Sequence, residues 1–133
     1  MTSAEVSVGH VDGDVYEIHV RGHHLTVDQP VDAGGTDKAP TPTELFAASL
    51  AACVAFYAGR YLDRHGDSRA GLRVHADFDM ATDRPARVAA IRVSVRPPEG
   101  FPAERIPALT AVAGHCTVHN TLMQPPDVNI TVG

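Results

Sequence analysis

Two cysteines are the residues of this chain with the clearest capacity for chemistry. Cys53 lies in LFAASLAACVAFYAG, a segment without a charged residue, and Cys116 lies between two histidines in VAGHCTVHNTL. A thiolate is a nucleophile, a metal ligand and a reductant. The two sulfurs therefore fit four interpretations, namely a metal site, a structural bridge, inert core residues or a working redox pair.

Each cysteine taken singly has an ordinary structural explanation. Free cysteine is among the most buried residue types, so Cys53 in an alanine-rich segment is typical of core filler. Cys116 is expected at the start of a short helix, where backbone N–H groups favour a thiolate. An inert role is therefore less typical of Cys116 than of Cys53.

A zinc site is the main alternative to filler. Cys116-x-x-His119 has the spacing of a zinc half-site, and the chain contains eight histidines. Cys53 and one further histidine would complete four ligands, the candidates being His19, His23, His24, His75 and His115. No Cys-x-x-Cys unit accompanies the half-site, so spacing alone supports only two ligands.

Size and charge restrict the classes of protein to consider. The chain has 133 residues, 44% of them hydrophobic and 20% charged, which predicts one globular domain over residues 1–133. The formal charge is −5 and no basic run occurs, which argues against nucleic acid or an anionic membrane surface as a partner.

The compartment is predicted from what the sequence lacks. Its first residues have no basic and apolar signal pattern, and the apolar run 45–59, at about 15 residues, is short beside the roughly 20 of a membrane span. We expect a soluble cytoplasmic protein that does not bind a membrane. In a reducing cytosol, two cysteines are more often free thiols or a transient disulfide than a permanent structural disulfide.

The hydrophobic pattern predicts an α+β domain of order βββ-α-ββ-α-α-β. Apolar and polar residues alternate over residues 5–28, with a hairpin turn at Asp12-Gly13, and again over residues 72–80 and 92–96. Helices are expected over residues 102–114 and 117–123, and a last strand over residues 127–132. Residues 28–40, rich in Gly, Pro and Asp, are expected to form a loop.

A long helix is predicted from Pro42 to about His65. Thr41 fits the N-cap and Glu44 the third helical position, which gives a capping box, and Gly66 fits the C-terminal stop. The first half of this helix is apolar or small on every side, so it has to be covered all round. One chain of this size can hardly do that, and we therefore expect a second copy to cover the helix in a homodimer, with the interface beside Cys53.

Two segments carry a family resemblance. GGTDKAPTPTELFAASLAACV and HCTVHNTL resemble the two signature segments of the OsmC/Ohr family, the osmotically inducible protein C and organic hydroperoxide resistance proteins. Their order, separation and flanking strand pattern also match. The resemblance implies the OsmC-like fold, in which antiparallel sheets wrap around central helices in an intertwined homodimer.

The resemblance also implies an activity. Family members are thiol peroxidases that reduce organic hydroperoxides, with a reactive cysteine corresponding to Cys53 and a resolving cysteine corresponding to Cys116. They are commonly recharged by a dithiol, such as a lipoyl group on another protein, and use no metal or prosthetic group. Such a mechanism requires a cation near the reactive thiol, because apolar surroundings raise a thiol pKa.

The sequence departs from the better-studied members at the groups that assist the thiol. They use an arginine from the N-terminal strands and a glutamate ten residues before the reactive cysteine, whereas position 43 is Thr here and the acid is Glu44. In a continuous helix Glu44 lies about 13 Å along the axis from Cys53 and on the opposite face. Arg21 is the best candidate for the cation. His119, one turn after Cys116, either tunes the resolving thiol or lines a pocket, and we expect the second. These departures resemble the OsmC-like branch of the family.

Three functions remain open for this chain. The leading hypothesis is a homodimeric organic hydroperoxide reductase with Cys53, Cys116, Arg21 and Glu44 as catalytic residues. The second is a non-catalytic protein that binds an apolar small molecule in a cavity beside Cys53. The third is zinc storage or sensing.

Overall fold

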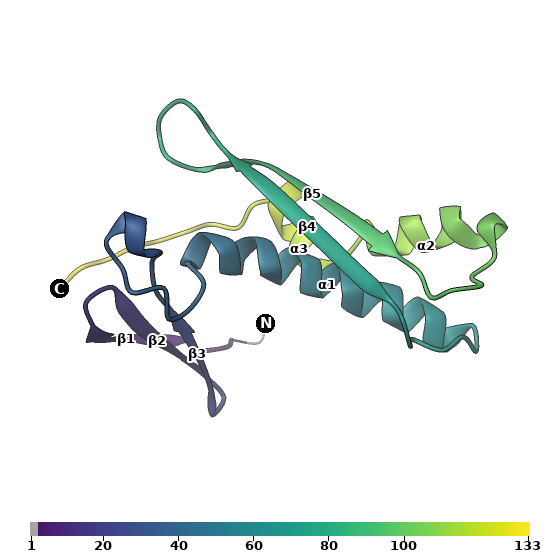
Figure 1. The fold of residues 1–133 in the computed structure, drawn as a ribbon, viewed down its shortest axis with the longest axis horizontal. Coiled ribbons are helices and arrows are strands. Elements are labelled where there is room, and N and C mark those ends of the chain that lie inside the picture. Colours follow the sequence, from purple (N-terminus) through teal and green to yellow (C-terminus); the bar gives the residue numbers. More distant parts are fainter. Residues whose placement is uncertain (1–2) are drawn as a thin grey trace. The chain divides into compact units, whose positions relative to one another are not determined.

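The computed structural model describes residues 3–133, which form two compact units that divide between Phe46 and Ala47. Figure 1 labels the elements in chain order. The strands and helices are β1 (Ser7–Asp12), β2 (Val15–Val20), β3 (His23–Val27), α1 (Pro42–Arg64), β4 (Arg73–Met80), β5 (Val88–Arg96), α2 (Ile106–Ala113) and α3 (Thr117–Met123), with short 3-10 helices at Val31–Ala33 and Ala103–Arg105. The chain is thus α+β, as the sequence predicts.

The first unit contains an antiparallel sheet in the order β1-β2-β3. Gly13, at φ 53°, makes the predicted turn after β1. Arg21 and Gly22, at φ 48° and 82°, connect β2 to β3 in a two-residue turn. Positive φ at both positions matches the type I′ hairpin turn, in which glycine is favoured and a residue such as arginine is uncommon.

A buried carboxylate organises the loop that follows β3. Asp28 is only 1% exposed, and it accepts hydrogen bonds from the Thr36 hydroxyl at 2.6 Å, the Gln29 N–H at 2.7 Å and the Lys38 N–H at 3.0 Å. The Thr36 hydroxyl and then the Lys38 N–H lower the pKa of Asp28 to about 2. Only glycine fits at Gly35, because a Cβ there would lie 2.1 Å from the Gln29 carbonyl oxygen.

Helix α1 begins and ends where the sequence predicts. The N–H of Thr41 donates to Glu44 Oε1 at 2.8 Å, and the N–H of Glu44 donates to Thr41 Oγ1 at 3.0 Å. This reciprocal pair is the predicted capping box. At the other end Gly66 takes the left-handed conformation, with φ 75°, just beyond the last helical turn.

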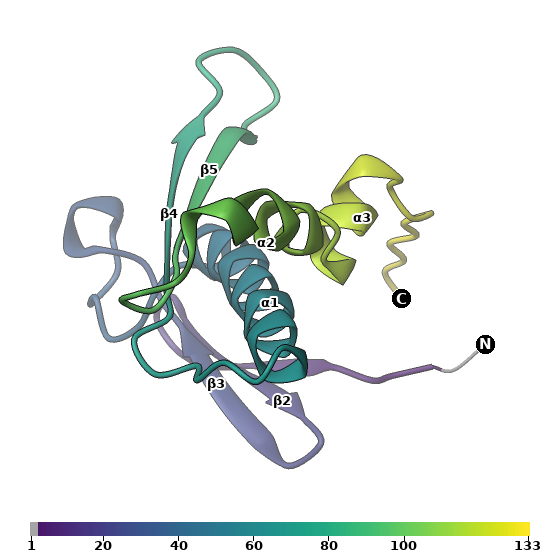
Figure 2. The same cartoon turned by 90° about the vertical axis from the view of Figure 1, so that its right-hand side faces the viewer.

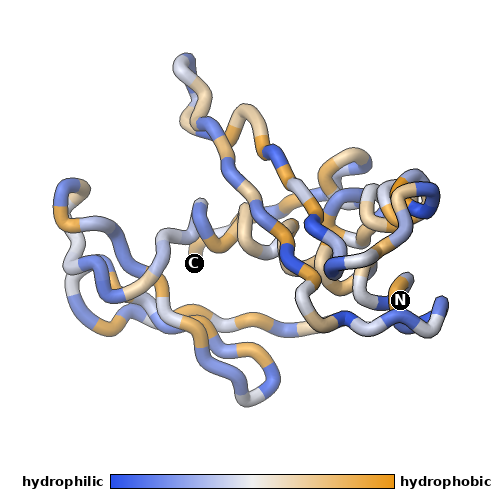
Figure 3. The backbone as a smooth tube through the Cα atoms, turned by 45° about the vertical axis from the view of Figure 1, so that its right-hand side comes forward, coloured by the Kyte–Doolittle hydropathy of each residue, from blue (hydrophilic) through white to orange (hydrophobic). Residues whose placement is uncertain are grey.

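The second unit packs the β4–β5 hairpin and the two short helices against α1. Viewed along α1, the hairpin lies on one side of this helix and α2 and α3 lie on others (Figure 2). Hydrophobic and hydrophilic residues alternate along both strands, as Figure 3 shows. The apolar side chains Val74, Val93 and Val95 pack against buried residues of α1, including Leu50 and Val54.

Helix α1 is longer than the apolar run in its sequence suggests. It has 23 residues and a mean hydropathy of 1.5 over its most apolar window, so by length and composition alone it could cross a membrane. The core helix of a folded domain meets the same criterion. Ala58 and Leu62 are fully buried in the second unit, which is the pattern of such a core helix.

Two predicted elements differ from the structure. The last strand, expected over residues 127–132, is wrong, because this segment lacks secondary structure and Val128, Ile130 and Val132 are 75%, 88% and 101% exposed. A strand needs a neighbouring strand to pair its backbone groups, and within the described residues of this chain the segment has none. The helix expected over residues 102–114 is divided into a 3-10 turn and the shorter α2.

Candidate active site

The second unit brings Cys53 and Cys116 together. Cys53, from the middle of α1, packs against a buried cluster formed by Leu50, Val54, Ala113 and Cys116. Both cysteines are free. Two residues far apart in the sequence thus meet inside one apolar cluster.

Cys116 is held at the N-terminus of α3. It is fully buried, and its Sγ accepts a hydrogen bond from the backbone N–H of His119 at 3.3 Å, as an N-cap. Burial raises the pKa of the Cys116 thiol, the His119 N–H lowers it, and the neighbouring Cys53 raises it again, with a net upward shift. Cys116 is therefore held as a neutral thiol, whereas Cys53 is the more accessible of the two.

A hydrogen bond joins α1 to α3 next to the thiols. The hydroxyl of Tyr57 lies 2.7 Å from Oγ1 of Thr117. Tyr57 follows Cys53 by one helical turn, and Thr117 directly follows Cys116 in the sequence. This contact therefore fixes the two helix segments that carry the cysteines.

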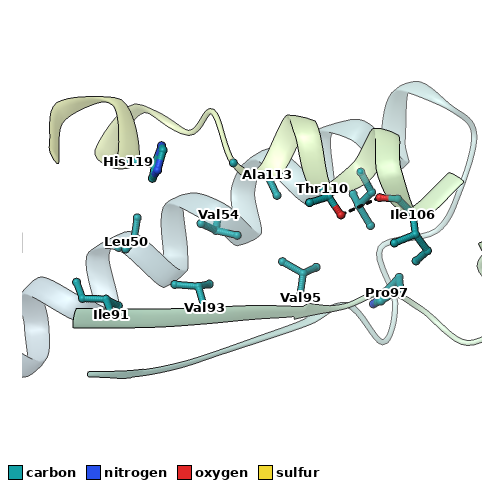
Figure 4. A pocket seen from close by; sticks show the side chains of 12 residues that line it. Leu50, Val54, Ile91, Val93, Val95, Pro97, Ile106, Thr110, Ala113 and His119 are labelled. Carbon is teal, nitrogen blue, oxygen red and sulfur yellow. Dashed lines mark hydrogen bonds between the residues drawn. The ribbon is translucent and has the colours of Figure 1, made fainter. Parts of the chain in front are cut away.

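An apolar pocket of about 420 Å³ lies between α1, β5 and α2 (Figure 4). Neither cysteine lines it, but it shares Leu50, Val54 and Ala113 with the cluster against which Cys53 packs. Leu50 and Val54 on α1 flank Cys53 in the sequence and line this pocket. Its remaining lining comes from Ile91, Val93, Val95, Pro97, Ile106, Leu109, Thr110, Ala113, Gly114 and His119. The volume falls in the range of small-molecule sites, and the lining suits an alkyl or aryl group.

His119 is the polar group of the pocket that has no internal partner. Its ring projects from α3 toward Leu50 in Figure 4, and its Nδ1 is buried without a hydrogen-bond partner among the described residues. The expectation that His119 lines a pocket is confirmed. A buried nitrogen of this kind is costly unless it is bonded, so the ring is ready to hydrogen-bond a molecule that enters the pocket.

Arg21 and Glu44 belong to the first unit. Arg21 is exposed in the β2–β3 turn, and Glu44 uses its carboxylate in the capping box of α1. In the second unit, the arginines with described contacts bind groups other than the thiols. Four form ion pairs with aspartates: Arg92 with Asp77 and Asp79, Arg105 with Asp67, Arg69 with Asp63, and Arg87 with Asp83. Arg60 lies over the Phe56 ring. The catalytic roles of Arg21 and Glu44 remain predictions.

The zinc site expected as an alternative at the cysteines is not assembled. Across residues 3–133, one group of at least three His, Cys, Asp or Glu side chains converges, and it consists of Glu17, His19 and His24. Neither cysteine takes part. The geometry at Cys53 and Cys116 thus provides two thiols and the nearby His119 imidazole. Two thiols and one imidazole are too few for a four-ligand zinc site and suit a redox pair better.

Sequence reasoning missed Tyr57 and Thr110. Tyr57 was detectable, because it is four residues after Cys53 and therefore on the same face of α1. Thr110 lines the pocket through the packing of α2 against β5, which no local pattern reports. The pocket residues of β5 were partly found, since Val93 and Val95 lie on the predicted apolar face.

The fold and the paired thiols define a class, the OsmC-like proteins. The family model described as OsmC-like protein matches residues 35–131, and the chain belongs to this family. This range begins at Gly35 and includes both cysteines and the residues that line the pocket. A comparison with curated proteins found no match.

Solved structures share the fold at low sequence identity. A candidate osmotic stress induced and detoxification response protein from Psychrobacter arcticus is 22% identical, with 91% of this chain and 89% of that chain covered and a TM-score of 0.82. An OsmC-like protein from Mycoplasma pneumoniae is 16% identical, with 93% and 89% covered and a TM-score of 0.78. The organic hydroperoxide resistance protein OhrB of Bacillus subtilis is 17% identical, with 93% of each chain covered and a TM-score of 0.67.

Proposed function

We propose that this protein is a thiol peroxidase that reduces organic hydroperoxides to alcohols, with Cys53 as the reactive and Cys116 as the resolving cysteine. The observation that carries the proposal is the contact between the half-buried Cys53 thiol and the buried Cys116 thiol beside an apolar pocket. Membership of a family that includes organic hydroperoxide resistance proteins supports it.

The proposed first step is attack of the Cys53 thiolate on the distal oxygen of the hydroperoxide. An S–O bond forms and the O–O bond breaks, so the sulfur is oxidised to a sulfenic acid and the peroxide is reduced. The alkoxide that leaves takes up a proton and departs as the alcohol. The pocket holds the organic group beside Cys53, which favours alkyl or aryl hydroperoxides over hydrogen peroxide.

In the second step the Cys116 sulfur attacks the sulfenic sulfur of Cys53. An S–S bond forms, the S–O bond breaks, and the hydroxyl leaves as water with the proton of the Cys116 thiol. A dithiol then reduces the disulfide to two thiols and becomes a disulfide itself. A lipoyl group on a protein partner is the proposed dithiol.

The structure gives the two cysteines different environments that suit this division of roles. The raised pKa keeps Cys116 protonated at neutral pH, so it does not compete for peroxide. Cys53 is the more accessible thiol. Arg21 is our proposed cation for ionising Cys53, and Glu44, which lies about 13 Å along the axis of α1 from Cys53 of its own chain, is proposed to act from the partner subunit.

Exposed apolar residues support a homodimer as the working form. Phe56 on α1 is 56% exposed and Met123 at the end of α3 is 69% exposed. The C-terminal segment adds Val128 and Ile130. Large apolar side chains exposed on several elements of one chain are typical of surfaces that a second copy covers.

Substitution of each cysteine tests the proposal. We expect Cys53→Ser to abolish dithiol-dependent turnover of cumene hydroperoxide. Cys116→Ser should allow one oxidation, after which Cys53 proceeds to sulfinic acid, as mass spectrometry would detect. Full turnover by the Cys53→Ser protein would falsify the assignment.

A second function, storage or transport of an apolar ligand, is favoured by the pocket and by the unpartnered Nδ1 of His119. Such a ligand would place its chain among the β5 valines and a hydrogen-bonding head near His119. Native mass spectrometry distinguishes the two proposals. A retained lipid or aromatic ligand, with no peroxide turnover, favours the binding protein.

A further inference from the structure

The first unit carries a group of metal-ligating side chains that the peroxidase proposal does not use. Glu17 and His19 are two positions apart on β2, so they lie on the same face of the strand. His24 lies on β3 directly opposite His19 in the antiparallel register. Two paired strands therefore hold the three side chains side by side.

The ligand atoms of these residues converge on one point. Glu17 Oε1 lies 2.8 Å from His19 Nε2 and 3.2 Å from His24 Nδ1. The two imidazole rings have centroids 4.4 Å apart and an interplanar angle of 71°. All three ligand atoms lie within 4.8 Å of one another.

This geometry points to a cation site: we propose that Glu17, His19 and His24 bind a divalent transition-metal ion of the zinc class. Zinc bonds to nitrogen and oxygen of about 2.0–2.2 Å place tetrahedral ligand atoms about 3.3 Å apart. The separation of 3.2 Å between Glu17 and His24 is close to this value, that of 2.8 Å between Glu17 and His19 is shorter by about 0.5 Å, and all three ligand atoms lie within 4.8 Å of one another. Two histidines and one glutamate form a known zinc ligand set.

The chemistry of the set selects the ion. Imidazole nitrogen suits zinc and neighbouring transition metals, whereas magnesium and calcium prefer oxygen ligands throughout. In the complex, Nε2 of His19 and Nδ1 of His24 face the ion without a proton. His19 then carries its proton on Nδ1 and His24 on Nε2.

The site is open to solvent. The side chains of Glu17, His19 and His24 are 40%, 44% and 57% exposed, so an ion can enter and water can occupy the remaining coordination positions. Three protein ligands with an open position are typical of exchangeable or catalytic zinc. The ligands need no rearrangement of the backbone, since the hairpin register already sets them.

Binding is tested by titrating the full chain, without an affinity tag, with Zn²⁺ in a calorimeter. The protein carries Cys53→Ser and Cys116→Ser, so that no thiol competes for the ion and the outcome is independent of the peroxidase proposal. We expect one Zn²⁺ to bind per chain and Mg²⁺ not to compete with it. Co²⁺ bound in place of Zn²⁺ should give a visible absorption spectrum typical of four- or five-coordinate cobalt.

Variants of the ligands identify the site. Glu17→Gln, His19→Gln and His24→Gln should each weaken Zn²⁺ binding by at least about tenfold, a loss at least as large as that on removing an outer-shell partner. His23→Gln is the matched control, because His23 is the exposed neighbour of His24 and pairs with Val20. It should leave the affinity unchanged.

Nuclear magnetic resonance of the histidine rings adds a readout at named atoms. Zn²⁺ should shift the resonances of His19 Nε2 and His24 Nδ1 and leave those of His23 in place. The proposal is overturned if the protein binds no Zn²⁺, or if His23→Gln weakens binding as much as the three ligand variants. It is also overturned if Zn²⁺ shifts the His23 resonances instead.

Discussion

The hydroxyl of Tyr57 and Oγ1 of Thr117 lie 2.7 Å apart, which joins α1 to α3 one turn beyond Cys53 and one residue beyond Cys116. The chain positions its two thiols through this polar contact as well as through apolar packing. A protein hydrogen bond contributes about 0.5–1.5 kcal/mol net. That amount is enough to change how readily the two sulfurs meet.

We expect Tyr57→Phe to weaken the proposed Cys53–Cys116 disulfide by about two- to tenfold, as judged from the free energy of one hydrogen bond. The disulfide fraction is measured against glutathione redox buffers of known ratio. Thr117→Val should have a similar effect, and the double variant should be no worse than either single variant. Additive losses would show that the two residues act separately.

The pocket predicts a size-dependent effect on substrate use. Thr110 lies at the edge of the pocket and is exposed, so Thr110→Phe adds a ring to the lining without filling the core. Because the added ring takes up space that the cumyl group would occupy, we expect KM for cumene hydroperoxide to rise roughly tenfold, the lower end of the cost of a group that fits an apolar pocket poorly. KM for tert-butyl hydroperoxide should change less.

Ala108→Phe is the control for this experiment. Ala108 is exposed on the same helix but does not line the pocket. It should leave both KM values unchanged. If the two variants behave alike, the pocket is not where the organic group binds.

The loop around Asp28 predicts an acid-dependent stability. The pKa of Asp28 is lowered to about 2, chiefly by the Thr36 hydroxyl, from about 3.9 in an unfolded chain. The stabilisation from the ionised group is thus fully present above about pH 4 and is lost as pH falls toward 2. Unfolding midpoints measured over this range should fall more steeply for the wild type than for Asp28→Asn. Parallel curves would contradict the assignment.

Local patterns in the sequence predicted most of the elements because each has a local cause. The capping box of Thr41 and Glu44 and the glycine at position 66 set the ends of α1, and period-two alternation marked β4 and β5. The last strand failed for the opposite reason. Val128 and Ile130 are exposed there, and a strand needs a neighbour that a local sequence pattern does not supply.

The sequence predicted only the part of the site that has a local pattern. The spacing of residues around Cys53 and Cys116 indicated that the two thiols matter, and the family resemblance indicated that they meet. The partner of Tyr57 depends on how α3 packs on α1, and the pocket depends on how α2 faces β5. These are tertiary relationships, for which a single sequence gives no periodic signal.

The C-terminal segment predicts where the proposed homodimer forms. Ile130 is 88% exposed in a single chain, and burying such a side chain contributes about 1.5–3 kcal/mol. We expect Ile130→Asp to weaken the dimer by at least about tenfold, as measured by light scattering over a range of protein concentrations. Thr131→Asp, which places the same charge on the adjacent residue, should have a smaller effect, because successive residues of an extended segment face opposite sides. Equal effects of the two variants would mean that charge alone drives the change, and a monomeric wild type would remove the homodimer from the proposed function.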